Sequence, residues 1–224
     1  MVRTKLVDQL KLEIQKYLGI PYFSNTSSVK SDNNAMVGKG TAREIALTAI
    51  ELANKQNIKL QDLTAVEIYR FHKKNKIGID CSGLVYHLCD YYYYLKTGKN
   101  IYSELKGTED KKGPRRLSAN LLTSPPNAIA IKNLNDIQTA DLIRMDQGKH
   151  VIFIIEKIKN TISYVHSSQK TKQKGVHYGH IKIINPSQDL STQLWSDSTL
   201  KKTSYQSLFS PKDGDGVFRL KVFV

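Results

Sequence analysis

Apolar residues recur at helical spacing through the first half of the chain. Leu6, Leu10, Ile14 and Tyr17 form one apolar stripe, and the Gly and Pro of 18–22 end the segment. Thr41 with Glu44 three positions later forms a capping box, which marks a second helix start. The pattern predicts helices over residues 4–18, 42–56, 63–71 and 81–96.

After residue 136 the pattern changes to short apolar runs and alternation, which is typical of strands. We expect strands near 141–145, 150–157, 161–166, 178–184 and 217–223. A tight turn at Asn160–Thr161 would join the second and third of these. Helices followed by strands predict an α+β domain with helices packed on a mainly antiparallel sheet.

Composition sets the charge and the size. The chain has 224 residues, with 34 Lys and Arg against 20 Asp and Glu, a formal net charge of +14. This length suits one domain, and the charge favours anionic partners such as nucleic acid, a membrane surface or a wall polymer. No apolar run approaches the roughly 18 residues needed to cross a bilayer, so we expect no transmembrane segment.

The two cysteines and the first residues exclude further classes. Two cysteines are too few for a disulfide framework or for a Cys₃ or Cys₄ zinc site. Cys81 and Cys89 lie eight residues apart in a predicted helix, too far to pair with each other. The stretch 1–9 has no apolar core of a secretory signal, so the chain is expected to be cytoplasmic as synthesised, with non-classical export or cell-wall action left open.

Cys81 carries the sharpest local signal. The segment Asp80-Cys-Ser-Gly83 stands where a loop gives way to a helix. Unpaired N–H groups and the positive end of the helix dipole favour a thiolate there, as a nucleophile requires. The alternative is a small buried hydrophobe, and the tetrapeptide alone does not choose between them.

A nucleophilic thiol needs a base, and two histidines are candidates. His150 opens one predicted strand and His166 ends the next, so a hairpin would bring them to the same end. This permits a Cys–His pair with a third, orienting group, although a histidine in such a position is, taken alone, more often a plain strand-end residue. His177 and His180 lack a His-Glu-x-x-His motif or further cysteines, so we predict no metal and no cofactor.

Several segments of the chain together resemble a known protein family. Four segments, Asp80-Cys-Ser-Gly-Leu-Val85, Asp136-Ile-Gln-Thr-Ala-Asp-Leu-Ile143, His150-Val151 and Tyr164-Val-His-Ser167, recur in this order in the NlpC/P60 cysteine peptidases. These are papain-like hydrolases that typically cut peptidoglycan stem peptides between γ-D-glutamate and a diamino acid. The resemblance implies a papain-like fold with Cys81 as nucleophile, His150 as base and His166 as the third polar residue.

The resemblance also implies a substrate site. Asp80 and Ser82 match positions that contact the free amino end of the substrate, and Tyr22, in Leu-Gly-Ile-Pro-Tyr, matches a tyrosine beside the active site. Tyr69, which lies twelve residues before the cysteine, is a second candidate for that tyrosine. Within a single domain over 1–224, we expect a helical insertion at about 24–76 and a loop-rich one at about 98–130. Ala140 and Ile152 stand where the family usually has glycine.

Two alternatives stay open. An amidase, deamidase or acyltransferase would use the same three residues. A basic nucleic-acid-binding protein would use the charge, concentrated in Lys111–Arg116, His72–Lys76 and Lys170–Lys174. Such clusters are more often solvated loops, and no nucleic-acid-binding signature accompanies them. The preferred partner is peptidoglycan or its muropeptides, and the sequence leaves the oligomeric state open.

Overall fold

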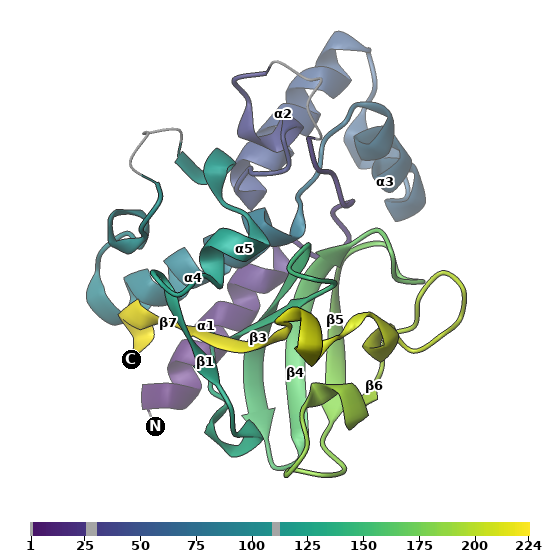
Figure 1. The fold of residues 1–224 in the computed structure, drawn as a ribbon. Coiled ribbons are helices and arrows are strands. Elements are labelled where there is room, and N and C mark those ends of the chain that lie inside the picture. The colour runs from purple at the N-terminus through teal and green to yellow at the C-terminus, as the bar shows by residue number, and fades with distance from the viewer. Residues whose placement is uncertain (1, 26–30, 109–112) are drawn as a thin grey trace.

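The structure is a computed structural model that describes residues 2–25, 31–108 and 113–224. The described residues form an α+β fold in which helices pack against a curled antiparallel sheet (Figure 1). This confirms the predicted α+β class and the mainly antiparallel sheet. Residues 111 and 112 of the predicted basic cluster Lys111–Arg116 lie outside the described residues.

Helices α2 and α4 begin at the residues that the sequence predicts, and α1 and α3 begin within two residues of their predicted starts. Their bounds are α1 Val2–Gln15, α2 Ala42–Lys55, α3 Ala65–Lys74, α4 Cys81–Thr97 and α5 Ala119–Leu122. Thr41 and Glu44 form the complete capping box at the start of α2. Thr64 and Glu67 repeat it at the start of α3, so two short helices each start at a defined residue.

One sheet contains the described strands. They are β1 Ala128–Ile131, β2 Leu142–Met145, β3 His150–Ile158, β4 Thr161–Ser168, β5 Gly175–Lys182, β6 Leu194–Trp195 and β7 Gly216–Leu220. Their order across the sheet is β1-β7-β2-β3-β4-β5-β6, and each neighbouring pair is antiparallel. The meander β2–β5 therefore forms the centre, and β7 returns from the end of the chain to pair with β2.

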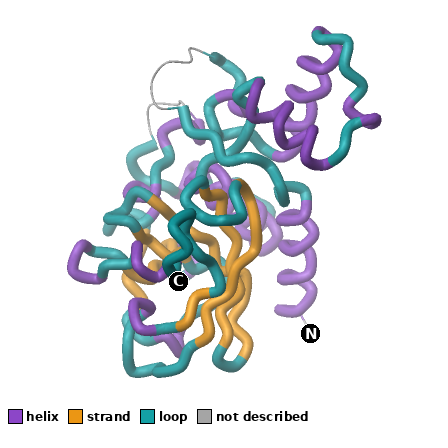
Figure 2. The backbone as a smooth tube through the Cα atoms, turned by 90° about the vertical axis from the view of Figure 1, so that its right-hand side faces the viewer, coloured by secondary structure: helices purple, strands orange, loops and turns teal. Residues whose placement is uncertain are grey.

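Each face of the sheet is covered by a different part of the chain. Helices α1 and α4 pack on one face, where the apolar side of α4 meets Val151, Phe153 and Val165 (Figure 2). The opposite face carries Ile152, Ile154 and Tyr164, covered by the segments that follow β5. Because both faces are buried, the first six residues of β3 are all buried, and the five that follow His150 are apolar instead of alternating with polar residues.

Apart from shifts of a few residues in their bounds, the predicted elements differ from the observed ones in a turn, two strands and a short helix. The turn between β3 and β4 is Lys159–Asn160, not Asn160–Thr161, because Lys159 takes the left-handed conformation at φ 51° and Thr161 already pairs in β4. Strands β1 and β6 were not predicted, since one is a four-residue edge strand with two exposed residues and the other has only two residues. The loop-rich insertion expected at about 98–130 also contains α5.

The predicted insertion at 24–76 contains α2 and α3. These two helices lie together at one end of the molecule, beyond the sheet (Figure 1). The segment that follows them returns to the body of the fold through Ile79, which forms isolated bridges to Tyr22 and Lys39. It thereby leads directly into Cys81.

Candidate functional site

Cys81 is the first residue of α4. Asp80 caps the helix, and its Oδ1 accepts a hydrogen bond from the Gly83 N–H at 2.7 Å. The Asp80 N–H in turn donates to the Gly38 carbonyl at 2.9 Å, so a second loop passes over the helix start. A Cβ at Gly83 would lie 2.4 Å from that carbonyl oxygen, so this position requires glycine.

The Cys81 thiol lies against the start of β3. Its Sγ is 4.0 Å from the Lys149 carbonyl oxygen, and the backbone N–H of Val151 donates to the sulfur. Its neighbours are thus the residues immediately before and after His150. Cys81 also lines a cavity of about 900 Å³, together with Tyr22, Lys149 and other residues. This volume is in the range of small-molecule sites.

Burial dominates the protonation of this thiol. It raises the pKa of Cys81 to about 11, and the nearby Asp80 adds to the shift, against smaller opposing contributions from the Val151 and Ser82 N–H groups and from Lys39. The N–H groups at the helix start thus lower the pKa of Cys81 as expected, but burial outweighs them in the substrate-free site. Cys81 is a neutral thiol at neutral pH and needs a base to take its proton.

His150 and His166 meet as the predicted hairpin requires. His150 is the first residue of β3, His166 lies in β4, and the strands run antiparallel. His150 Nε2 is 2.9 Å from His166 Nδ1, and the rings stand edge to face. Tyr205 packs against both rings, with centroids 6.1 Å and 5.4 Å away, and so holds them in place.

The histidine chain continues beyond the residues that the sequence singled out. His166 Nε2 lies 3.1 Å from Asp197 Oδ2 and 3.0 Å from His177 Nε2. Tyr164 donates its hydroxyl to the same carboxylate oxygen at 2.8 Å. No signal in the sequence marked either residue, because His177 has no motif partner and Asp197 lies in a polar stretch without a motif. The register of β4 and β5 places His177 opposite His166, and the segment after β6 brings Asp197 to the same ring.

Hydrogen-bond chemistry assigns the protons along this chain when the three rings are neutral. The Gly175 carbonyl can only accept, so His177 Nδ1 donates to it at 2.9 Å and His177 Nε2 keeps a lone pair. His166 Nε2 faces that lone pair and the Asp197 carboxylate, so it carries the proton. His166 Nδ1 must then accept from His150 Nε2. His150 Nδ1 is left unprotonated, which is the form able to accept a proton from a thiol.

The surroundings keep the inner rings neutral. Burial lowers the pKa of His150 well below its usual value, and the neighbouring His166 lowers it further. Burial also lowers the pKa of His166, although its bond to Asp197 opposes this. Burial alone would raise the pKa of Asp197, but the hydrogen bonds that His166 and Tyr164 donate to it help to hold that pKa below its usual range. The chain therefore ends in a carboxylate.

Lys39 occupies the positions assigned to the amino end of a substrate. Its buried ammonium donates to Asp80 Oδ1 at 2.8 Å, to the Leu117 carbonyl at 2.8 Å and to Ser82 Oγ. Asp80 and Ser82 lie beside Cys81 as predicted, but in this structure both are engaged by this internal amine. No motif marked Lys39, since it comes 41 residues before Asp80 and reaches it through the Gly38–Asp80 bond.

The two candidate tyrosines lie in different places. Tyr22 pairs with Ile79 and lines the cavity beside Cys81 and Asp80. Tyr69 lies on α3 and is not among the residues that line this cavity. The structure therefore brings Tyr22, and not Tyr69, to the thiol.

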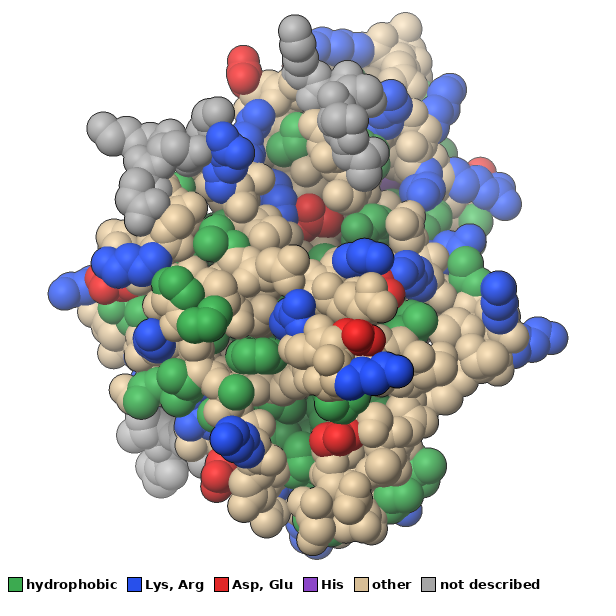
Figure 3. All heavy atoms as spheres, in the orientation of Figure 1, with side chains coloured by type: hydrophobic (Ala, Val, Ile, Leu, Met, Phe, Trp, Pro, Cys, Tyr) green, Lys and Arg blue, Asp and Glu red, His purple; other side chains and the backbone are tan. Residues whose placement is uncertain are grey.

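The charged groups of the cavity are mainly basic. Lys39, Arg115, Arg116 and Lys149 line it against two acids, one of which is the Asp80 paired with Lys39. Lys and Arg side chains are otherwise spread over the whole visible face of the molecule (Figure 3). The cavity thus combines a buried thiol with a mainly positive lining, and Lys149, which precedes His150, is one of its lining residues. This arrangement can add a thiol to the carbonyl of an anionic compound.

The chain matches no protein-family model, no curated protein and no solved structure. Within the described ranges, none of the helices has both the length and the apolar character required to cross a bilayer.

Proposed function

We propose that this protein is a cysteine hydrolase of the NlpC/P60 type that cleaves peptidoglycan stem peptides at the bond between γ-D-glutamate and a diamino acid. One observation carries the proposal: the Cys81 thiol, at a helix start, contacts the backbone on both sides of His150, whose ring is bonded to His166. A papain-like site needs a nucleophile, a base and an orienting residue that follow one another in space in this order.

The proposed reaction is a two-step acyl transfer. His150 takes the Cys81 proton as the sulfur attacks the amide carbonyl, since burial favours the neutral thiol before substrate binds. The thiol and amide give a thioester and an amine, and His150 returns the proton to the departing amine. Water then hydrolyses the thioester. Backbone N–H groups at the start of α4 supply the oxyanion donors, excluding the Gly83 N–H, which is bonded to Asp80.

The cavity supports an anionic substrate. A γ-D-glutamyl residue carries a free α-carboxylate next to the bond that is cut, and the basic lining complements it. Lys39 neutralises the Asp80 carboxylate, so Asp80 attracts a substrate ammonium less strongly than the family resemblance implies. We therefore propose that recognition rests on the substrate carboxylates more than on its free amino end.

The test is digestion of purified muropeptides with product analysis by mass spectrometry. We expect a new amine and a new γ-D-glutamyl carboxylate with the wild-type protein, and neither with Cys81→Ala. Adding a free amine acceptor separates hydrolysis from acyl transfer, because a transferase would form the new amide. Intact stem peptides with both proteins would contradict the proposed substrate class. Nucleic-acid binding with a steep salt dependence in that case would favour the basic binding protein instead.

A further inference from the structure

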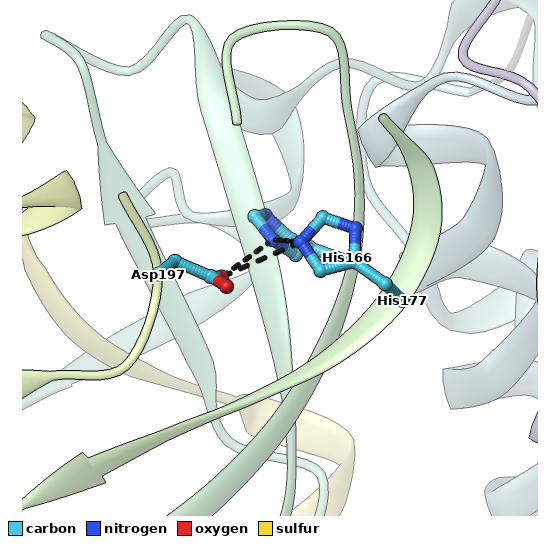
Figure 4. A group of neighbouring side chains, drawn as sticks. All are labelled: His166, His177 and Asp197. Carbon is cyan, nitrogen blue, oxygen red and sulfur yellow. Dashed lines mark hydrogen bonds and ion pairs between the residues drawn. The ribbon is translucent and has the colours of Figure 1, made fainter. Parts of the chain in front are cut away.

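A second group of side chains lies behind the catalytic candidates. His166 from β4, His177 from β5 and Asp197, two residues after β6, direct one atom each toward a common point (Figure 4). The separations are 3.0 Å between the two Nε2 atoms, and 3.1 Å and 3.5 Å from these atoms to Asp197 Oδ2. Both rings are buried, and the Asp197 side chain is 12% exposed.

These separations match the ligand spacing of a small divalent ion. A tetrahedral site with metal–nitrogen and metal–oxygen bonds of roughly 2.0–2.2 Å places its ligand atoms about 3.3 Å apart. Two imidazoles and one carboxylate are a donor set suited to Zn²⁺ and related ions. The observed triangle differs from that spacing by only a few tenths of an ångström.

The groups around the triangle also suit a metal. The Gly175 carbonyl holds the proton of His177 on Nδ1 and leaves Nε2 free to ligate, as backbone carbonyls commonly do for metal-binding histidines. Tyr164 donates to Asp197 and orients the carboxylate. A separate cavity of about 410 Å³ is lined by Asp197 with Lys172, Gln173, Ser196 and Ser198. One of the three ligand residues therefore borders a second cavity, whereas both histidine rings are buried.

We propose that His166, His177 and Asp197 bind a divalent transition-metal ion of the Zn²⁺ class, and that this binding switches off His150 as a base. The second half rests on the proposed function. A metal on His166 Nε2 moves the proton of that ring to Nδ1, which then donates to His150 Nε2 instead of accepting from it. The His150 proton moves to Nδ1, the atom that must receive the Cys81 proton. Each ring keeps one proton, so no acid or base is consumed.

The binding test uses the metal alone and does not depend on activity. Zn²⁺ is titrated calorimetrically into metal-free Cys81→Ser protein, and Co²⁺ is used to report ligand geometry by its visible absorption. We expect one ion per chain, with Co²⁺ bands of a four-coordinate N/O site. His177→Ala should weaken binding about 100-fold or more, whereas His180→Ala, on the exposed side of the same strand, should bind as before.

Asp197→Asn is the second ligand variant, used if His177→Ala fails to fold. No Zn²⁺ binding at millimolar ion, or undiminished binding by the folded ligand variant, would overturn the site. Inhibition is then measured on muropeptide hydrolysis, with each variant compared with its own metal-free rate. Zn²⁺ should inhibit the wild type and His180→Ala but not the ligand variant. Binding without inhibition overturns the switch, whereas a metal-free wild type that is inactive while its metal titration succeeds overturns only the proposed function.

Discussion

His150 Nε2 lies 2.9 Å from His166 Nδ1, at the end of the sheet where β3 begins. This contact sets which nitrogen of His150 carries the proton, so in the proposed reaction His166 orients the base without touching substrate. We predict that His166→Ala lowers kcat/KM for muropeptide cleavage by about 100-fold, within the range of general-base contributions. Cys81→Ala should abolish cleavage.

The pH dependence of kcat/KM for wild type and His166→Ala is the control that separates a positioning role of His166 from a purely structural one. A positioning role makes the rate of His166→Ala depend on pH differently from wild type, because His166 lowers the pKa of His150 and its removal lets that pKa rise. His166→Gln, which keeps a hydrogen-bonding group near His150, should recover part of the rate. Equal rates and profiles for wild type and His166→Ala would show that the contact plays no part in the reaction.

The two cysteines should differ in their reaction with an alkylating reagent. Cys81 lines a cavity and burial raises its pKa to about 11, so its alkylation rate should rise with pH up to about that value. Cys89 is buried in the core on the same helix and should stay unlabelled while the protein is folded. The measurement is the iodoacetamide rate from pH 6 to 11 in the Cys89→Ala variant. A rate already at its plateau below pH 8 would indicate a pre-formed thiolate–imidazolium pair instead.

Lys39 and Asp80 form a buried ion pair, 2.8 Å apart, in the wall of the cavity. Lys39→Met leaves the Asp80 carboxylate buried without its cation, so we expect a loss of about 3–5 kcal/mol in the free energy of unfolding. Adding Asp80→Asn should recover much of this loss, because asparagine has no charge yet still offers an acceptor to the Gly83 N–H. Urea unfolding of the single and double variants measures both. Additive losses would show that the two charges are not coupled.

The extent to which sequence anticipated this site depends on how local each signal is. The α4 start at Cys81 and the hairpin that joins His150 to His166 follow from capping residues and strand periodicity, which act over a few positions. Asp197 lies 31 residues after His166 and reaches it through the order of the strands in the sheet. Lys39 lies 41 residues before Asp80 and reaches it where two loops cross. Local periodicity does not encode contacts over such separations.

Ala140 shows a further limit of sequence patterns. The family resemblance expects glycine there, and the backbone is indeed left-handed at φ 70°, yet this chain carries a buried alanine. At position 140 the left-handed backbone is therefore present without the glycine that usually signals it, so the residue type alone does not predict that conformation.

Substitution of Gly83 tests how strongly the position of Cys81 depends on the loop at Gly38, which passes over the start of α4. An alanine in a helix normally adds about 1 kcal/mol of stability over glycine, but here its Cβ meets the Gly38 carbonyl. We expect Gly83→Ala to cost about 1–3 kcal/mol and to change the Cys81 alkylation rate. Gly98→Ala, at the other end of α4 with φ 72° and open space around it, should lose about 1–2 kcal/mol and leave that rate unchanged. Equal effects of both on Cys81 would point to global loosening.

Tyr22 and Tyr69 allow a direct comparison of two candidate substrate contacts. Tyr22 lies in the cavity beside Cys81, whereas Tyr69 lies on α3 and does not line it. Tyr22→Phe removes one hydroxyl and keeps the ring, so we expect kcat/KM for muropeptide cleavage to fall about 2- to 10-fold, the value of a single hydrogen bond. Tyr69→Phe should cleave as the wild type does. The substrate must be used well below KM, so that a weakened ground-state contact is not hidden by saturation. If Tyr69→Phe slows cleavage while Tyr22→Phe does not, the substrate approaches from the α3 side, and the cavity next to Cys81 is not where the stem peptide lies.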